Sequence, residues 1–295
     1  MVFKNREEII NNGETPELRE KRRLVLDILT AAVEAVNPYN AVKELFQDNT
    51  ILLEDENIDL SRYSNIYIVA FGKASVGMTQ AVCDSISINR GVVITNDPNG
   101  RVECEKVDTV VGGHPIPNNG SINGAKQAQQ IVSNCREDDL LLVLISGGGS
   151  ALLCDPRIPL EDLQDVTNLL LRSGATINEI NTIRKHLSHV KGGQLIQHVP
   201  CRVISLIISD IIGDPVEFIA SGPTAPDSTT FEDAKRILEK YNLWNRIPDS
   251  ARRIITNGLM GKIPETPKED NEVFRRVKNI IVANNEKACR TAKGY

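Results

Sequence analysis

Aromatic residues are scarce in this sequence, and several signals that would place it in a particular protein class are missing. Phe, Tyr and Trp make up 4% of the 295 residues, whereas all hydrophobic residues make up 41%. The core must therefore consist mainly of aliphatic side chains. Residues 1–10 carry charges and no apolar signal region, and the longest apolar runs are far too short to span a membrane. These absences favour a cytoplasmic globular protein without a membrane partner.

Cysteine and histidine lack the spacing of a metal site. The six cysteines include no C-x-x-C pair, and none lies near a histidine pair with metal-binding spacing. Reduced thiols are therefore expected rather than disulfides or zinc ligands. The formal net charge of -5 argues against a nucleic-acid partner, because such domains are usually basic. It does not exclude a phosphorylated ligand, which a locally positive site can bind on an acidic protein.

Strand-like and helix-like segments alternate along the chain. Continuous apolar runs predict strands that are buried on both faces, and helical periodicity predicts helices between them. The alternation predicts an α/β fold, with a mostly parallel sheet and helices on both faces in a Rossmann-like three-layer sandwich. The expected strands are 66–71, 92–95, 109–111, 140–145, 203–208 and 279–283. The expected helices are 15–36, 41–47, 75–86, 118–133, 160–172, 177–190, 229–241 and 249–260.

Capping residues and a polar stretch mark some boundaries. Capping boxes are predicted at Thr176 with Glu179 and at Thr229 with Glu232, because each pair has the S/T-x-x-E spacing. The stretch 262–271 (KIPETPKEDN) is polar and contains two prolines. It therefore predicts a linker.

Three of the expected strands end in segments of small or charged residues. Gly72 and Lys73 follow the first strand, Ser146–Ser150 follows 140–145, and Asp210 and Asp214 come after 203–208. Ligands of such sheets gather beyond the carboxyl ends of the strands. The three segments together therefore predict a binding site at one edge of the sheet.

A run of three glycines between two serines favours anion binding over a simple flexible turn. Glycines let backbone N–H groups approach an anion closely, and a following helix start would add its positive dipole end. One glycine would suffice for a turn. Leu152 occupies a position that both G-x-G-x-x-G and G-x-S-x-G require to be glycine, and no Walker pattern is present. The run consists of Ser146, Gly147, Gly148, Gly149 and Ser150.

The charged residues at the strand ends have two interpretations each. Lys73 favours a carboxylate or phosphate partner, although most lysines are solvated surface residues. Asp210 and Asp214 suit magnesium or hydroxyl binding in phosphoryl transfer. They equally suit helix capping, and the sequence alone does not decide between ligand binding and capping.

Helix 177–190 carries several polar side chains. Asn181 and Arg184 share one face, and Lys185 lies on the neighbouring one. Taken alone, this pattern is typical of an ordinary exposed charged face. His114 lies in a turn-forming run, GGHP, for which a structural role is sufficient.

Six stretches of the chain resemble the class of glycerate kinases that carry a C-terminal MOFRL domain. Their order and intervals also fit that class, and they cover most of the chain. The resemblance implies an α/β fold with its active site in a cleft between two domains. The stretches are AFGKASVGM (70–78), GGHPIPNNGS (112–121), LISGGGSALL (144–153), NTIRKHLSHVKGGQL (181–195), SLIISDIIGDP (205–215) and IASGPTAPD (219–227).

The resemblance implies transfer of the γ-phosphate of ATP, with magnesium, to the 2-hydroxyl of D-glycerate. Lys73, Asp210 and Arg184 would be catalytic, with Asp210 linked to the magnesium ion. ATP and glycerate are the expected small-molecule partners, and a homodimer is the expected assembly. The residues implied in binding substrate or phosphate are Ser146, Gly147, Gly148, Gly149, Ser150, Asn181, Lys185 and Asp214.

The resemblance also implies a domain boundary and leaves alternatives open. Residues 1–260 would form the large substrate-binding domain, and 261–295 would hold a linker and the incomplete beginning of a MOFRL-type domain. One alternative function is a hydroxypyruvate reductase, although the missing dinucleotide fingerprint speaks against it. Another is a truncated module that binds a small acid and transfers nothing.

Overall fold

The apolar runs of the sequence form one six-stranded sheet, in which every strand is parallel to its neighbours. The computed structural model describes residues 2–294, and Met1 and Tyr295 lie outside the described residues. The strand order is β6-β5-β4-β7-β8-β9, so the order reverses between β4 and β7, as in dinucleotide-binding sheets. The strands are β4 (Ile66–Phe71), β5 (Arg90–Thr95), β6 (Val107–Val111), β7 (Leu140–Ile145), β8 (Arg202–Ile208) and β9 (Val277–Ala283).

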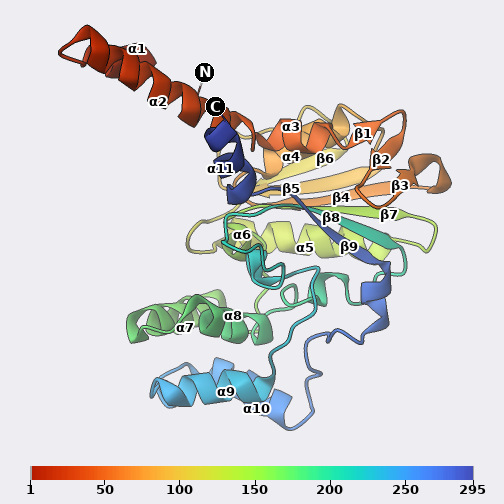
Figure 1. Cartoon of the computed structure of the whole chain (residues 1–295). Helices are drawn as coiled ribbons and strands as arrows, with labels where there is room; N and C mark the ends of the chain where they lie inside the picture. Colours follow the sequence, from red (N-terminus) through yellow and green to blue (C-terminus); the bar gives the residue numbers. More distant parts are fainter. Residues whose placement is uncertain (1, 295) are drawn as a thin grey trace.

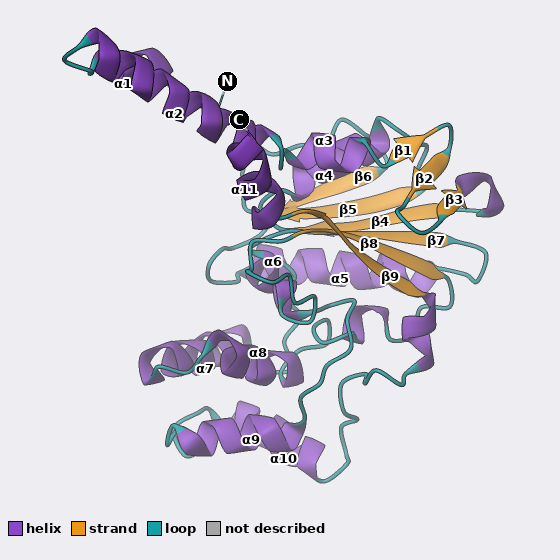
Figure 2. Cartoon of the chain, in the orientation of Figure 1, coloured by secondary structure: helices purple, strands orange, loops and turns teal. Residues whose placement is uncertain are grey.

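Helices cover both faces of this sheet, which confirms the predicted α/β fold (Figure 1). The pleat sends successive side chains to opposite faces. Val69 packs in the same core as Ala125 of α5, and its neighbour Ala70 packs in a second core with Met78 of α4. Figure 2 shows α3 and α4 on one side of the strands and α5 on the other. The covering helices are α3 (Pro38–Lys43), α4 (Ser75–Cys83) and α5 (Asn119–Asn134).

Four further helices form a layer of their own beyond α5 (Figure 1). They share a separate apolar cluster that includes Leu170, Ile183, Phe231 and Ile255. The residues of α8 therefore belong to a helical layer rather than to the surface of the sheet. The four helices are α7 (Leu160–Ser173), α8 (Ile177–His186), α9 (Phe231–Lys240) and α10 (Asp249–Leu259).

The capping predictions are half correct. The box at Thr176 and Glu179 is confirmed, since each side chain bonds the other's backbone amide. The box predicted at Thr229 is wrong, because Thr230 and Asp233 form it one residue later. Thr229 instead donates its hydroxyl to a carboxylate, 2.7 Å from Asp227 Oδ1. Spacing alone could not decide between two consecutive threonines.

Smaller elements complete the chain. The helix predicted at 41–47 is wrong in register, because α3 starts at Pro38 and residues 46–47 form a strand of a separate small antiparallel sheet. These elements are α1 (Arg6–Asn11), α2 (Pro16–Glu34), β1 (Phe46–Gln47), β2 (Thr50–Leu52), β3 (Asn57–Asp59), α6 (Gly149–Leu152) and α11 (Asn285–Gly294). Short 3-10 helices lie at Leu60–Arg62, Gln194–Ile196, Ile219–Ser221 and Glu272–Arg276.

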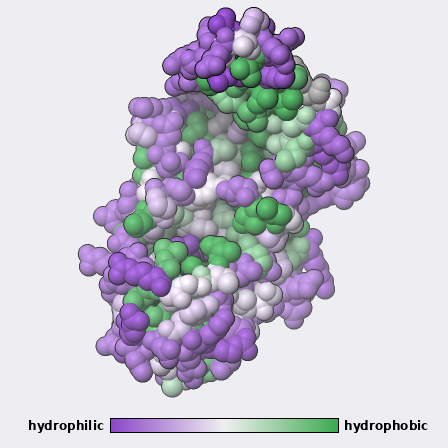
Figure 3. Space-filling model, turned by 60° about the vertical axis from the view of Figure 1, so that its left-hand side comes forward, coloured by the Kyte–Doolittle hydropathy of each residue, from purple (hydrophilic) through white to green (hydrophobic). Residues whose placement is uncertain are grey.

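Helices α1 and α2 project from the body of the molecule, and α11 packs against α2 (Figure 1). In Figure 3, where this side is turned forward, hydrophobic patches interrupt a largely hydrophilic surface. None of the helices within residues 2–294 is long and apolar enough to cross a membrane. The exposed apolar side chains of α2 are Leu18, Leu24, Val25, Leu29 and Val33.

The last strand extends the main sheet. β9 pairs with β8 in parallel, with an irregularity in register between Ile207 and Ile208. The expected boundary after residue 260 therefore falls between α10 and a strand of this sheet. The polar stretch 262–271 is a loop, and a short 3-10 helix follows it.

Candidate active site at the carboxyl edge of the sheet

The loops that follow β4 and β7 lie side by side. The amide of Ser146 donates to Phe71 O at 3.1 Å, and the amide of Lys73 donates to Gly147 O at 2.9 Å. The amide of Ala74 also donates to Ser146 Oγ at 3.0 Å. Because the strand order reverses between β4 and β7, the two loops border the crevice where open α/β sheets bind ligands.

The glycines of the second loop allow other polar residues to approach its backbone. A Cβ atom at Gly147 would lie 2.2 Å from Asp210 Oδ2. A Cβ atom at Gly148, where φ is +86°, would lie 2.9 Å from His114 Cδ2 and 3.3 Å from Lys73 Cγ. The structure thus gathers Lys73, His114 and Asp210 around the loop.

Backbone amides of the loop are available to a ligand. Within residues 2–294, the amides of Gly147, Gly148 and Ser150 donate to no protein acceptor. Successive amides in such a loop form a concave site for an anion. The helix after the loop, α6, is a single turn of four residues. The expected contribution of a helix dipole is therefore small, and the amides themselves provide the anion-binding capacity.

The two aspartates occupy different surroundings. Asp210 is exposed, and within the described residues its carboxylate accepts no hydrogen bond. It therefore does not cap a helix. Asp214 has a positive φ of 51° and accepts a hydrogen bond from Asn284 Nδ2 at 2.5 Å. Of the two, Asp210 lies against the loop, and among the described residues its carboxylate oxygens have no hydrogen-bond donor.

His114 was not predicted as a functional residue, yet it lies beside the loop. Burial lowers the pKa of His114, and the nearby Lys73 ammonium lowers it further, against an opposing effect of Asp210. The imidazole is therefore neutral at neutral pH. The available signal was the run GGHP between a strand and a helix, which a turn also explains.

Polar side chains hydrogen-bond the glycine loop at its last residue, Ser150. Ser150 Oγ lies 2.9 Å from Ser221 Oγ, and Ser221 Oγ donates to Asn181 Oδ1 at 3.1 Å. Lys191 Nζ donates to the carbonyl oxygens of Ser150 at 2.7 Å and Leu153 at 2.9 Å. Asn181 thus reaches the loop through Ser221, and Lys191 is a contact residue that the sequence did not single out.

Lys185 does not lie at the loop. Its side chain is fully buried, with Nζ 3.1 Å from Asp227 Oδ1 and 3.8 Å from Glu217 Oε2. Burial would raise the pKa of Asp227, but the Lys185 charge and hydrogen bonds from Thr229 outweigh it, so the pKa is lowered. The predicted exposed charged face of α8 is wrong, because α9 and the loop around Asp227 cover it.

Arg184 is a second residue of α8, after Asn181, that approaches the loop region. It lines a pocket together with Ser150 and Lys191. Burial lowers the pKa of its guanidinium group. A half-buried cation near the loop is suited to bind an anion.

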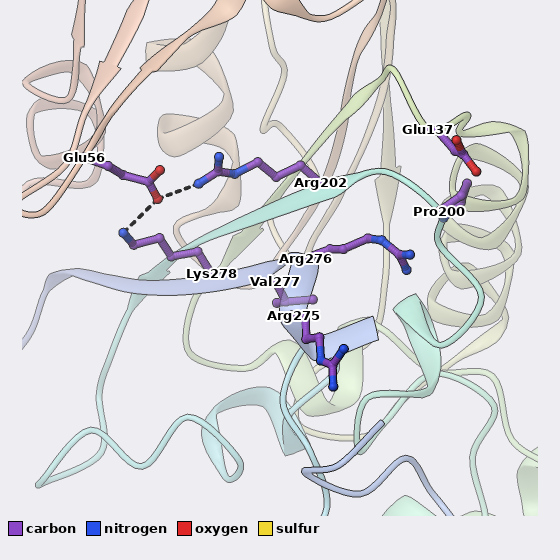
Figure 4. Close-up of a pocket in the computed structure, with 8 residues that line it drawn as sticks. All are labelled: Glu56, Glu137, Pro200, Arg202, Arg275, Arg276, Val277 and Lys278. Carbon is purple, nitrogen blue, oxygen red and sulfur yellow. Dashed lines mark hydrogen bonds and ion pairs between the residues drawn. The ribbon is translucent and has the colours of Figure 1, made fainter. Parts of the chain in front are cut away.

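A larger pocket opens at the opposite end of the sheet, where β8 and β9 begin (Figure 4). There Glu56 accepts hydrogen bonds from Arg202 at 2.5 Å and from Lys278 at 2.9 Å. Arg275 and Arg276 point away from Glu56 (Figure 4). Ligands of open α/β sheets bind at the carboxyl ends of the strands. We therefore place the candidate site at the glycine loop.

The residues at the loop suit a nucleotide-bound magnesium ion better than a metal held by protein alone. In the described part of the chain, no three His, Cys, Asp or Glu side chains gather in a metal-binding cluster. Magnesium usually takes one or two carboxylates and completes its shell with phosphate oxygens and water. Asp210, exposed beside the loop, fits that requirement.

Comparisons with known proteins identify the family. Residues 24–256 match the model of a domain of unknown function, DUF4147. The chain belongs to this family. Relatives of this DUF4147 chain include a glycerate 2-kinase of Pyrococcus horikoshii, 44% identical over 272 residues, which cover 91% of this chain and 60% of the relative. A D-glycerate 2-kinase of Thermotoga maritima is 37% identical over 277 residues, with coverages of 92% and 60%. The chain thus spans about 60% of the length of these relatives.

Solved structures agree with the fold. A Pyrococcus horikoshii protein aligns with a TM-score of 0.84 at 43% identity, covering 92% of this chain and 62% of that one. The glycerate kinase of Thermotoga maritima aligns with a TM-score of 0.78 at 36% identity, covering 92% and 61%. These matches confirm the resemblance to glycerate kinases. One relative, from Agrobacterium vitis, is named a putative hydroxypyruvate reductase and is 37% identical over 253 residues, covering 84% and 53%.

Proposed function

We propose that this protein is a cytoplasmic glycerate 2-kinase, which transfers the γ-phosphate of ATP to the 2-hydroxyl of D-glycerate with magnesium. The observation that carries the proposal is the triple-glycine loop, flanked by Lys73 and Asp210, in a chain 44% identical to a glycerate 2-kinase. Phosphoryl transfer requires mainly positioning and charge neutralisation. The loop edge offers backbone amides, an ammonium group and a carboxylate for these tasks.

Each group at the loop has a proposed role. The amides of Gly147, Gly148 and Ser150 hold anionic oxygens, and Lys73 neutralises charge that develops during transfer. Asp210 binds magnesium, which supplies charge neutralisation for the phosphates when it is bound. His114, kept neutral by its surroundings, hydrogen-bonds the acceptor hydroxyl.

Three of the residues expected to bind ligands receive other roles in this proposal. Asn181 supports the loop through Ser221, and Asp214 orders the loop after β8 through Asn284. Lys185 stabilises the helical layer through Asp227. The second domain from residue 261 onward and the homodimer stay predictions.

The proposal is tested by measuring ADP formation with D-glycerate, and with glycerol as a matched acceptor that lacks the carboxylate. We expect ADP release that depends on both magnesium and D-glycerate. Calorimetry with D-glycerate and with a non-hydrolysable ATP analogue, each alone, separates binding from transfer. Binding of both ligands without any ADP release would favour the binding module over the kinase.

A reductase is the alternative that a specific observation favours. The sheet has the strand order of dinucleotide-binding folds, and one relative is named a putative hydroxypyruvate reductase. The loop at the switch point, however, lacks the third glycine of the dinucleotide fingerprint, because Leu152 stands there. NADH oxidation in the presence of hydroxypyruvate would support the reductase, and we expect none.

A further inference from the structure

A small pocket lies behind the glycine loop, between the loop and helices α7 and α8. Ser150 contributes to both the loop and the pocket. Two cations, Arg184 and Lys191, line the pocket, and among the described residues no carboxylate does. The pocket therefore concentrates positive charge next to the anion-binding amides.

Arg184 brings an uncompensated charge to this pocket. Within residues 2–294, its guanidinium makes no hydrogen bond and no ion pair, and burial lowers its pKa. Arg184 is half-buried, and a charge that is partly removed from water without a partner is costly, so folds usually pair it or solvate it. The unpaired guanidinium of Arg184 therefore indicates a site where a bound anionic ligand forms the ion pair.

Lys191 brings a second charge with one free donor. Its side chain is buried, with the residue 3% exposed, and Nζ donates to the carbonyl oxygens of Ser150 and Leu153. An ammonium group has three donors, so one N–H remains for the pocket that the residue lines. Burial lowers the pKa of Lys191 to about 8, and Arg184 contributes to the shift.

The small volume of the pocket limits the size of the anion that it can hold. Its free volume is about 20 Å³, and a cavity needs roughly 10–15 Å³ to hold one water molecule. A space of this size admits only a small group, such as the oxygens of a carboxylate, and excludes a triphosphate. Leu163 and Leu187 also line the pocket and limit the length of any chain attached to the carboxylate.

We propose that this pocket is the carboxylate subsite for a short 2-hydroxy acid, with Arg184 and Lys191 as its two cationic ligands. The identity of the acid rests on the proposed kinase function. The charge and size of the subsite do not depend on it. Through its bonds to Ser150 and Leu153, Lys191 also links the occupied subsite to the position of the glycine loop.

The test is calorimetric titration of D-glycerate into the wild-type protein, Arg184→Met and Lys191→Met, each with and without a magnesium-bound non-hydrolysable ATP analogue. Each substitution should weaken D-glycerate binding by about ten- to a hundredfold, the effect of losing a hydrogen bond to a charged group. Lys126→Met, which removes an exposed lysine of α5, is the control and should bind like wild type. D-Lactate should bind to the wild type, and glycerol should not.

A pH titration separates a charge on Lys191 from a structural role. D-Glycerate affinity of the wild type should fall as pH rises past about 8, because the ammonium group loses its proton there. The affinity of Arg184→Met for D-glycerate should still decrease over this pH range, whereas the affinity of Lys191→Met should not change with pH. If Lys191→Met does not fold, the wild-type titration and Arg184→Met still decide.

Three outcomes would overturn the subsite. They are equal D-glycerate affinity in Arg184→Met and wild type, an affinity that stays constant across pH 8, or no binding of either acid by the wild type. The kinase proposal fails separately. D-Glycerate binding that depends on Arg184 and Lys191, without ADP formation, would remove the kinase and keep the subsite.

Discussion

A single methyl group on the glycine loop should displace the carboxylate of Asp210, to which we assign a catalytic role. In Gly147→Ala, the new Cβ would lie 2.2 Å from Asp210 Oδ2, whereas ordinary contact begins at 3.4 Å. The carboxylate must therefore move by about 1.2 Å, the difference between these two distances. A misplacement of about 1 Å can lower a rate about a hundredfold, which corresponds to about 2.7 kcal/mol in the activation barrier.

The same substitution should leave the fold intact. The atom in the way is the end of an exposed, flexible side chain, so the free energy of unfolding should change by less than about 0.5 kcal/mol. The measurements are ADP formation at saturating D-glycerate and ATP, and the melting temperature.

Gly174→Ala is the matched control for Gly147→Ala. Gly174 ends α7 with a φ of +78°, and no heavy atom of residues 2–294 lies within 4 Å of the position of an added Cβ. Alanine there should cost about 1 kcal/mol through its left-handed backbone, which lowers Tm by about 2 °C. Turnover should stay normal. Normal turnover in Gly147→Ala as well would refute the reasoning, because the position of Asp210 would then not matter.

Three further predictions follow from the same geometry. Lys73→Ala should lower turnover by about a hundred- to a thousandfold, as expected for the loss of one preorganised donor. It should leave Tm unchanged, and normal turnover would make Lys73 a solvated surface residue. Asp210→Asn should raise the magnesium concentration needed for half-maximal activity, and an unshifted magnesium titration would contradict the metal role. Asp227→Asn should destabilise the fold by about 3–5 kcal/mol, because it leaves the buried Lys185 charge unpaired. Because the pKa of Asp227 is lowered in the folded state, the wild-type stabilisation is present above its ordinary pKa of about 3.9. It should be lost as pH falls further, and chemical denaturation at several pH values should show a smaller acid-dependent loss in the variant.

Local sequence signals were sufficient to predict the strands of the central sheet. The apolar runs 66–71 and 140–145 match β4 and β7 residue for residue, because strands buried on both faces need continuous hydrophobic sequence. Since the carboxyl ends of parallel strands share one edge, the chain order also brought Lys73, the glycine loop and Asp210 into one candidate site.

The remainder of the site depends on contacts between distant parts of the sequence. Lys185 is buried because Asp227, 42 residues away, provides its partner. Lys191 and His114 reach the loop because the segment after α8 and the turn after β6 both pack against it. Neither carries a local pattern that distinguishes it from an ordinary surface residue, so sequence reasoning could not place them.

The identity of the phosphorylated product shows which hydroxyl group of D-glycerate accepts the phosphate. The protein is incubated with ATP, magnesium and D-glycerate, and the product is passed to enolase without phosphoglycerate mutase. We expect immediate formation of phosphoenolpyruvate, because enolase acts on 2-phosphoglycerate. A product that enolase accepts only after mutase is added would be 3-phosphoglycerate, and it would contradict transfer to the 2-hydroxyl group.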